Sequence, residues 1–364
     1  MKENESAPTQ DPLFQINFLL WLTNPVHKDY FKPILHENGF ELFSVEQTLP
    51  ISPEILARLK NIPHKGNPTP DVIISKDEVF LVFECKASMF GSANTMNDGH
   101  LKQCRSLLMQ TPEVLSDAIA GIKVSQSFVL YLTSDDSSVE QSKGLVEIRN
   151  ELIKFGVSVV DIGLISILSE GKTVGIKLKH DSSRNISKLI NAELNTYIPV
   201  FSANDKERDI RFLYYIPWMP DSESIRNKYN EEMFGNRLLM AVAQILGPQK
   251  TPFVAKLEAH ELLDEITFGI FSKWRNRDQK KSLIRDAKTL IKDSFKAILP
   301  DIVLDSLQSP ESGFKVNIET EKIKTAILEG LRGRHAKTNE WLNPDKPFEP
   351  DLFDDTHTAN TKNQ

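Results

Sequence analysis

The first half of the chain alternates between strand-like and helix-like patterns of apolar residues. Short runs rich in β-branched and aromatic residues predict buried strands, and apolar residues three or four positions apart predict helices. Gly, Pro and Asn mark the ends of most of these segments. Helices are expected at 29–37, 52–63, 100–110 and 139–155, and strands at 40–49, 72–74, 79–83, 127–133 and 157–162. The predicted order is therefore α-β-(α)-β-β-α-β-α-β.

The second half of the chain has a different pattern, dominated by helical periodicity. One further strand is expected at 173–178 and a short helix at 187–194, before a polar linker at 202–206. Helices are then expected at 222–235, 236–246, 256–271, 278–299 and 321–331. We therefore predict an N-terminal extension and helix (1–24), an α/β domain (25–200), a mainly α-helical domain (201–342) and a disordered acidic tail (343–364).

Composition narrows the class of protein only moderately. The chain has 364 residues, of which 40% are hydrophobic and 26% charged, as in ordinary globular proteins, and it is long enough for two cores. No apolar run reaches the ~18 residues of a membrane helix, and the N-terminus lacks the apolar stretch of a signal peptide. Two cysteines do not suggest a disulfide framework. We expect a cytoplasmic protein without a membrane partner.

Pro70–Asp71, followed after a short hairpin by Phe83–Glu84–Cys85–Lys86, is the most informative pair of motifs. On a strand, Glu84 and Lys86 point to the same face because side chains alternate. Both would end a buried strand, where polar groups without a ligand are costly. Two carboxylates beside a lysine can hold one hard divalent cation and act on a phosphodiester. The alternative is that Glu84 and Lys86 neutralise each other and Asp71 caps a turn.

These residues resemble the motif of the PD-(D/E)XK nuclease superfamily, which has the restriction-endonuclease-like fold. The resemblance covers roughly residues 25–165 and implies an αβββαβ core, here with one inserted helix. It implies Mg²⁺ or Mn²⁺ bound by Asp71, Glu84 and the carbonyl of Cys85. Lys86 would then position the attacking water or stabilise the pentavalent phosphate.

The same resemblance draws attention to further positions. An acid from the first helix or strand often joins the metal site, and Glu37, Glu41 and Glu46 are all candidates, each of which is otherwise an ordinary surface acid. In the exonuclease-like branch the helix after the lysine carries a Gln and, four residues later, a Tyr. Gln103 is suitably placed, but residue 107 is Leu. Gln103 either faces the site or is an exposed helix residue.

A basic stripe is predicted on one helix of the second half. Its members are spaced by three or four residues and so share one helix face, beside an apolar stripe. They are Lys281, Arg285, Lys288, Lys292 and Lys296. Such a stripe can bind the phosphates of nucleic acid, or it can be a solvated face. Because the net charge is −6, any contact with nucleic acid depends on local patches of this kind.

The resulting hypothesis is a Mg²⁺- or Mn²⁺-dependent nuclease that acts on nucleic acid, with DNA favoured over RNA by the resemblance alone. Prokaryotic restriction or anti-phage defence is the natural setting for such an enzyme. Two alternatives stay open: a non-cleaving nucleic-acid-binding module, and a partner-activated subunit of a larger defence complex. A protein partner and a homodimer both stay open as forms of assembly. The expected activity is that of an endo- or an exodeoxyribonuclease.

Overall fold

The computed structural model describes residues 8–28, 31–57, 62–86, 98–170, 173–179, 184–202, 215, 225–307 and 313–341. These residues belong to two compact units, of which one ends and the other begins between Ile210 and Arg211. Residues 203–206 of the predicted linker and the predicted tail at 343–364 lie outside the described residues.

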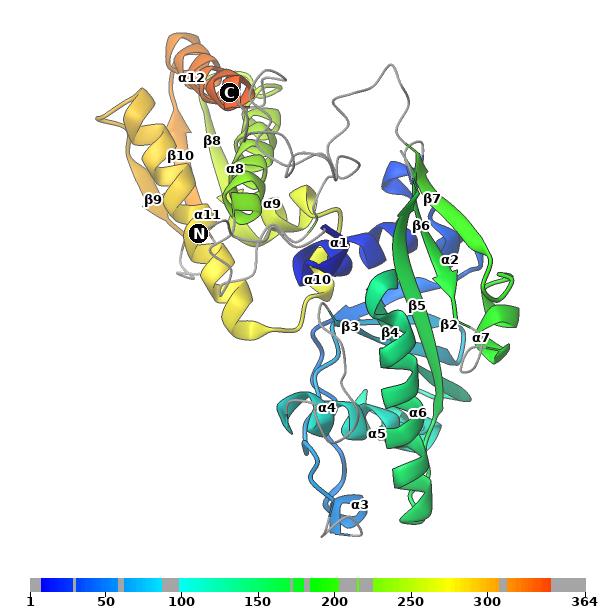
Figure 1. Cartoon of the computed structure of the whole chain (residues 1–364). Coiled ribbons are helices and arrows are strands. Elements are labelled where there is room, and N and C mark those ends of the chain that lie inside the picture. Colours follow the sequence, from blue (N-terminus) through cyan, green and yellow to red (C-terminus); the bar gives the residue numbers. More distant parts are fainter. Residues whose placement is uncertain are drawn as a thin grey trace, which may run out of the picture. The chain divides into compact units, whose positions relative to one another are not determined.

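The first unit is built on a seven-stranded sheet whose strands follow one another in space as they do in the chain (Figure 1). Strands β1 to β3 are antiparallel, β3 to β5 are parallel, and β5 to β7 are antiparallel again. The unit is thus mixed α/β. The strands are β1 (Glu41–Val45), β2 (Val72–Lys76), β3 (Val79–Lys86), β4 (Gln126–Ser134), β5 (Asp161–Glu170), β6 (Thr173–Leu178) and β7 (Tyr197–Ser202).

Helices cover both faces of this sheet. Helices α4 (Asp98–Leu108), α5 (Pro112–Ala118) and α6 (Ser138–Lys154) share one hydrophobic core with the side chains of Ile73, Phe80 and Val82. Helix α1 (Pro12–Thr23) contacts β3 but contributes nothing to that core, so it packs on the opposite face. All its residues from Leu13 onward are buried, and α1 therefore belongs to the core of this unit rather than to an extension.

Short helices complete the first unit. They are α2 (Ile34–Glu37), α3 (Pro53–Ala57), α7 (Arg184–Leu189) and the 3-10 turns Pro8–Gln10, Pro25–His27 and Asp135–Ser137. The predicted helix 29–37 is thus only four residues long among the described residues, and the helix expected at 187–194 begins three residues earlier. Neither α5 nor β7 was predicted. The strand expected at 157–162 begins only at Asp161, because the N–H of Val160 bonds to the carbonyl of Leu108 in α4 at 2.9 Å.

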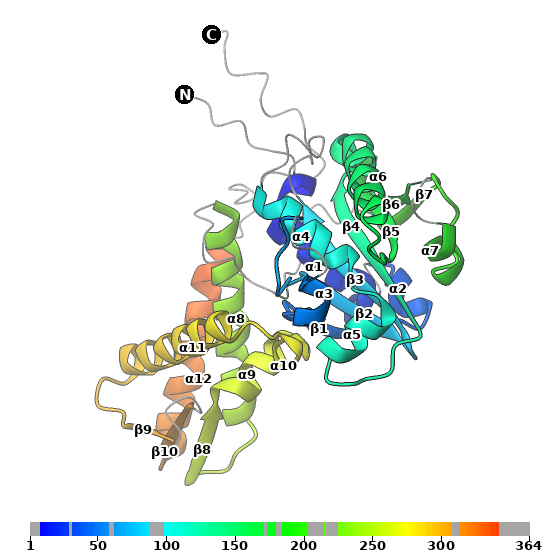
Figure 2. The same ribbon diagram turned by 90° about the horizontal axis from the view of Figure 1, so that it is seen from below.

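The second unit combines helices with a three-stranded antiparallel sheet, ordered β8-β10-β9 (Figure 2). The prediction of a mainly helical domain therefore omitted this sheet. Its strands are β8 (Phe253–Glu258), β10 (Gly313–Ile318) and β9 (Leu304–Ser306). Its helices are α8 (Ile225–Leu246), α9 (Ala259–Ile266), α10 (Ile270–Lys273), α11 (Arg277–Ile298) and α12 (Glu321–Trp341).

The helix predicted at 256–271 is wrong in its first part. Ala255 and Leu257 are buried while Val254 and Lys256 are exposed, which is the two-residue period of a strand. The helices expected at 222–235 and 236–246 are one continuous helix, α8, which accommodates Gly235 in its interior. A single glycine weakens a helix without ending it.

Candidate active site

Asp71 and Glu84 come together at the end of the β2–β3 hairpin. Val72 lies opposite Phe83 in the antiparallel ladder, so the preceding residue, Asp71, lies beside Glu84. The backbone N–H of Asp71 donates to the carbonyl of Phe83 at 3.0 Å. In turn, the N–H of Cys85 donates to Asp71 Oδ2 at 2.6 Å. The two carboxylates are thus held by backbone geometry, on the face of the sheet that α4 covers.

Lys86 completes this group. Its Nζ lies 2.6 Å from Glu84 Oε1, and the two side chains are only 15% and 5% exposed. Helix α4 contributes Gln103, which is buried and whose Nε2 donates to the carbonyl of Thr69 at 2.8 Å and approaches Glu84 Oε2 at 3.5 Å. Of the predicted site residues, Asp71, Glu84, Lys86 and Gln103 therefore lie together.

The electrostatics of the group are dominated by burial. Burial, and next the charge of Glu84, raise the pKa of Asp71 well above its usual value. Burial by itself would lower the pKa of Lys86, but the charges of Glu84 and Asp71 outweigh it, so that this pKa is raised. Lys86 therefore stays protonated at neutral pH. The group carries one cation for two carboxyl groups, and a further positive charge would stabilise the ionised form of Asp71.

The structure distinguishes among the three acids considered for the metal site. Glu37 and Glu41 are exposed, and Glu41 lies at the far end of β1, opposite Ser75. Glu46 follows the near end of β1, and its N–H donates to the carbonyl of Asp71 at 2.8 Å. Its charge also contributes to raising the pKa of Asp71. Glu46 has a φ of 49°, a left-handed backbone conformation that is unusual for this residue type.

Two residues near the site were missed by the sequence analysis. Gln15 of α1 is fully buried, and its Nε2 donates to the carbonyl of Lys86 at 3.1 Å and to that of Thr9 at 2.9 Å. Its polarity within a mainly apolar helix was a usable signal. His100, in the first turn of α4, has a pKa lowered by burial and then by the charge of Lys86. Nothing in the local sequence distinguishes His100 from a surface histidine.

The donors suit a hard cation better than a soft one. Burial raises the pKa of the Cys85 thiol well above its usual value, and strand parity directs this side chain to the face opposite Glu84 and Lys86. The Cys85 side chain is therefore not expected to bind a metal as a thiolate. Metal binding by the Cys85 carbonyl stays a prediction. Within the described ranges, no group of three or more His, Cys, Asp and Glu side chains is arranged to hold a metal. Oxygen ligands from two carboxylates nevertheless fit Mg²⁺, which usually keeps several waters.

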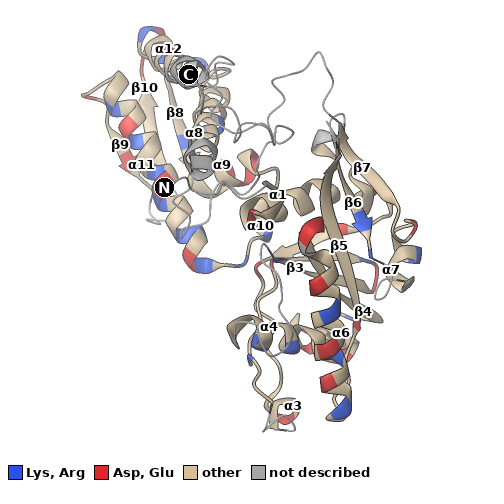
Figure 3. Ribbon diagram, in the orientation of Figure 1, with Lys and Arg blue, Asp and Glu red and all other residues tan. Residues whose placement is uncertain are grey.

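The basic stripe lies on α11 in the second unit, where Lys and Arg recur along the helix (Figure 3). Lys281, Arg285, Lys292 and Lys296 are exposed and Lys288 is half-buried. The interleaved apolar side chains face the core of this unit; those fully buried are Leu283, Ala287, Ile291 and Phe295. The stripe is therefore the outer face of an amphipathic helix.

Comparisons of the chain with protein-family models, with curated proteins and with solved structures find no match in any of the three. Among the described residues, no helix combines the length and the apolar character that crossing a membrane requires.

Proposed function

We propose that this protein is a metal-dependent nuclease whose active site is formed by Asp71, Glu84 and Lys86. The observation that carries the proposal is the buried group itself. Two carboxylates from adjacent strands lie on one sheet face, with a lysine 2.6 Å from one of them. A structural ion pair needs only Glu84 and Lys86. The second carboxyl, Asp71, makes the buried group electrostatically unfavourable without a further cation, which is typical of functional sites.

Asp71 and Glu84 would hold one Mg²⁺ or Mn²⁺, with the Cys85 carbonyl as the predicted third protein ligand. When bound, such an ion polarises the phosphate and lowers the pKa of a water molecule. Glu46 is the acid best placed to support the ion, since its charge already acts on Asp71. Gln103 holds the Thr69 carbonyl and lies near Glu84, so it would position that carboxylate.

Lys86 would stabilise the negative charge of the phosphate during cleavage. Its ammonium stays protonated because both neighbouring carboxylates raise its pKa. A protonated lysine can orient an attacking water as a donor, or bind the oxygens of the pentavalent phosphate. Gln15 fixes the carbonyl of Lys86 and so holds the end of β3 in place. It is a positioning residue in this proposal.

The finer fold assignment is part of the same proposal. The order of α1 or α2, three antiparallel strands, α4 and then the parallel strand β4 is the order that the resemblance to PD-(D/E)XK nucleases implies for an αβββαβ core. Helix α3 between β1 and β2, helix α5 between α4 and β4, helices α6 and α7 and strands β5 to β7 would be additions to it. DNA is the substrate favoured by that resemblance, and defence against phage is the proposed setting.

The test is a cleavage assay with purified full-length protein on plasmid, linear duplex, single-stranded DNA and RNA. Products should appear with Mg²⁺ or Mn²⁺, disappear with EDTA, and be absent for the Glu84→Gln variant. Plasmid linearisation would indicate an endonuclease, and loss of linear substrate alone an exonuclease. Binding without cleavage under every metal condition would favour a non-cleaving module, and cleavage that requires an added protein would favour a partner-activated subunit.

A further inference from the structure

The basic stripe of α11 does not lie on an open convex surface, since four of its five residues, all except Lys296, line a groove. We refer to this hollow, of about 460 Å³, as the α11 groove. Its lining residues come from α11, β9 and β10, all within the second unit: Lys281, Ile284, Arg285, Lys288, Thr289, Lys292, Ser306 and Phe314. Four of these eight residues are cationic and none is acidic.

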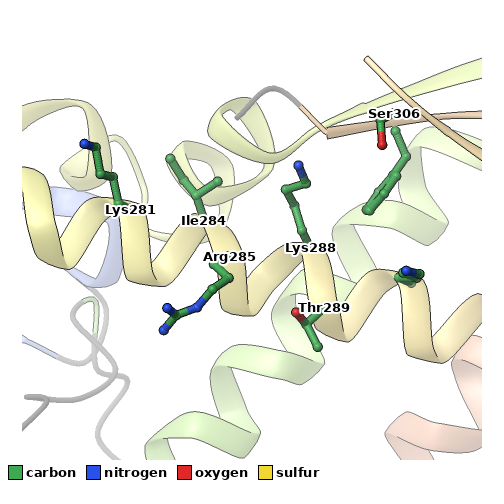
Figure 4. A pocket seen from close by; sticks show the side chains of 8 residues that line it. Lys281, Ile284, Arg285, Lys288, Thr289 and Ser306 are labelled. Atoms are coloured by element: carbon green, nitrogen blue, oxygen red, sulfur yellow. The ribbon is translucent and has the colours of Figure 1, made fainter. Parts of the chain in front are cut away.

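The side chains in the groove have distinct positions (Figure 4). Lys281, Ile284 and Lys288 project from α11 on the side of the strand that carries Ser306, whereas Arg285 projects on the other side in this view. Arg285 also lies 3.4 Å from the carboxylate of Asp286. Lys288 lies over the Phe314 ring, with its Nζ 5.5 Å from the ring centroid. The groove thus combines cationic side chains with an aromatic ring that lies under Lys288.

The length and the volume of the α11 groove suit a narrow anionic chain. From Lys281 to Lys292 the helix rises roughly 16 Å, which is long enough for several consecutive phosphates of one strand. The hollow has the volume of a site for a small ligand, so it can enclose the sugar and phosphate groups of one strand. At about 460 Å³ the hollow is far smaller than a stretch of base-paired duplex of that length, which would therefore contact only its edge. A cationic groove that follows the backbone is typical of proteins that bind single strands.

We propose that the α11 groove binds the sugar–phosphate backbone of single-stranded nucleic acid through Lys281, Lys288 and Lys292. This inference rests on the proposed nuclease function and deepens it by naming the form of the substrate. Ser306 offers a hydroxyl at the opposite wall, and the half-buried Ile284 supplies apolar surface for the sugars. Because lysines contact phosphates as point charges, binding would be insensitive to base sequence.

The experiment measures binding by the full-length protein in EDTA, so that it is independent of cleavage. Fluorescence anisotropy would compare a labelled oligothymidylate of about 12 nucleotides with a duplex of the same length over a salt series. Three phosphate contacts predict that log affinity for the single strand falls with log salt at a slope of about −2 from this groove. The Lys288→Gln/Lys292→Gln variant should flatten this slope by about 1.4. Its effect on duplex affinity should be clearly smaller.

The matched control is Lys256→Gln/Lys315→Gln, which removes the same charge from the same unit. These two lysines are exposed and opposite each other on β8 and β10. This control should keep the wild-type slope. Because Lys288 lies over Phe314, Lys281→Gln/Lys292→Gln serves as a second variant that leaves this contact intact. It should likewise flatten the single-strand slope by about 1.4.

The inference is overturned if both groove variants bind the single strand with the wild-type slope, or if the control variant weakens binding equally. It is also overturned if the groove variants lose duplex affinity as much as single-strand affinity. Failure of the nuclease proposal has a different signature. In that case no metal condition gives cleavage, while the groove variants still lose binding to the single strand.

Discussion

The ammonium of Lys86 lies 2.6 Å from the carboxylate of Glu84, on the same face of β3 and almost out of contact with solvent. The pair is adjacent to a second carboxyl group, that of Asp71, whose pKa is raised by burial and by Glu84. Removing any one of these three charges therefore changes both the chemistry of the site and the stability of the fold. The first two predictions use this coupling.

The first prediction concerns Lys86→Ala. We expect cleavage to fall by at least ~100-fold, because a charge that stabilises the transition state is lost. The variant should fold, although with a lower melting temperature in EDTA, since Glu84 then lacks its buried partner. Lys76→Ala, at the exposed far end of β2, is the control and should cleave like the wild type. Undiminished cleavage by a folded Lys86→Ala variant would assign Lys86 a structural role only.

The second prediction is that Asp71→Asn has opposite effects with and without metal. In EDTA the melting temperature should rise, because the amide can still accept the Cys85 N–H while the unfavourable buried carboxylate is gone. With saturating Mn²⁺ the wild type should gain about 2–3 kcal/mol, as expected at ~100 times the dissociation constant, and the variant far less. Asp77→Asn, at an exposed turn position with a φ of 52°, is the control and should respond to Mn²⁺ like the wild type.

The stabilisation expected of Asp71→Asn in EDTA should depend on pH in one direction. In the unfolded chain the Asp71 carboxyl ionises near the ordinary pKa of 3.8, and in the folded protein only at higher pH. At a pH well below 3.8 the carboxyl is protonated in both the folded and the unfolded state. Its ionisation then makes no difference to the free energy of unfolding. As the pH rises above this value, the unfolded state ionises first and the metal-free folded state loses stability. The advantage of Asp71→Asn in EDTA should therefore grow from acid to neutral pH. An advantage that is constant with pH would show that it has another cause.

The third prediction concerns the ion pair between Arg105 and Glu151, which links α4 to α6. Helix α4 is also the helix that carries Gln103. The Arg105 side chain is 7% exposed, and its Nη2 donates to both carboxylate oxygens of Glu151 at 2.9 and 2.8 Å. Glu151→Gln should lower the free energy of unfolding by about 1–2 kcal/mol, measured by urea denaturation. Glu140→Gln, on an exposed turn of α6, should stay within ~0.5 kcal/mol of the wild type. Equal stability of the two variants would contradict the prediction.

The local parts of the fold and site were predictable because their determinants lie within a few residues. The alternation of side chains along a strand was enough to place Glu84 and Lys86 on one face of β3. The short turn after Lys76 was enough to predict that Asp71 lies beside that strand. Gln103 was predicted as one of two possibilities, and its burial decides between them. The β8 strand was missed because a period-two segment runs directly into α9 without a turn, so that one helical pattern seemed to extend over both.

The parts that could not be predicted depend on contacts between distant segments. Gln15 reaches Lys86 across 71 positions of sequence, and only the packing of α1 on β3 creates that contact. The α11 groove needs β9 and β10 beside the helix, so the stripe by itself could not distinguish a groove from a solvated face. The choice among Glu37, Glu41 and Glu46 likewise required the register between β1 and β2.

The last prediction is that Glu46 supports the metal site whereas Glu41 does not. Glu41 is the first residue of β1 and Glu46 follows its last, so only Glu46 lies at the end near Asp71, with its N–H bonded to the Asp71 carbonyl at 2.8 Å. Its negative charge acts on Asp71 and would therefore also attract a cation bound there. Glu46→Gln should weaken Mn²⁺ binding roughly ten-fold, the usual minimum effect of a supporting residue around a metal. Titrating Mn²⁺ against melting temperature measures this affinity without relying on cleavage. Glu41→Gln is the matched control, and equal Mn²⁺ affinities for the two variants would remove Glu46 from the site.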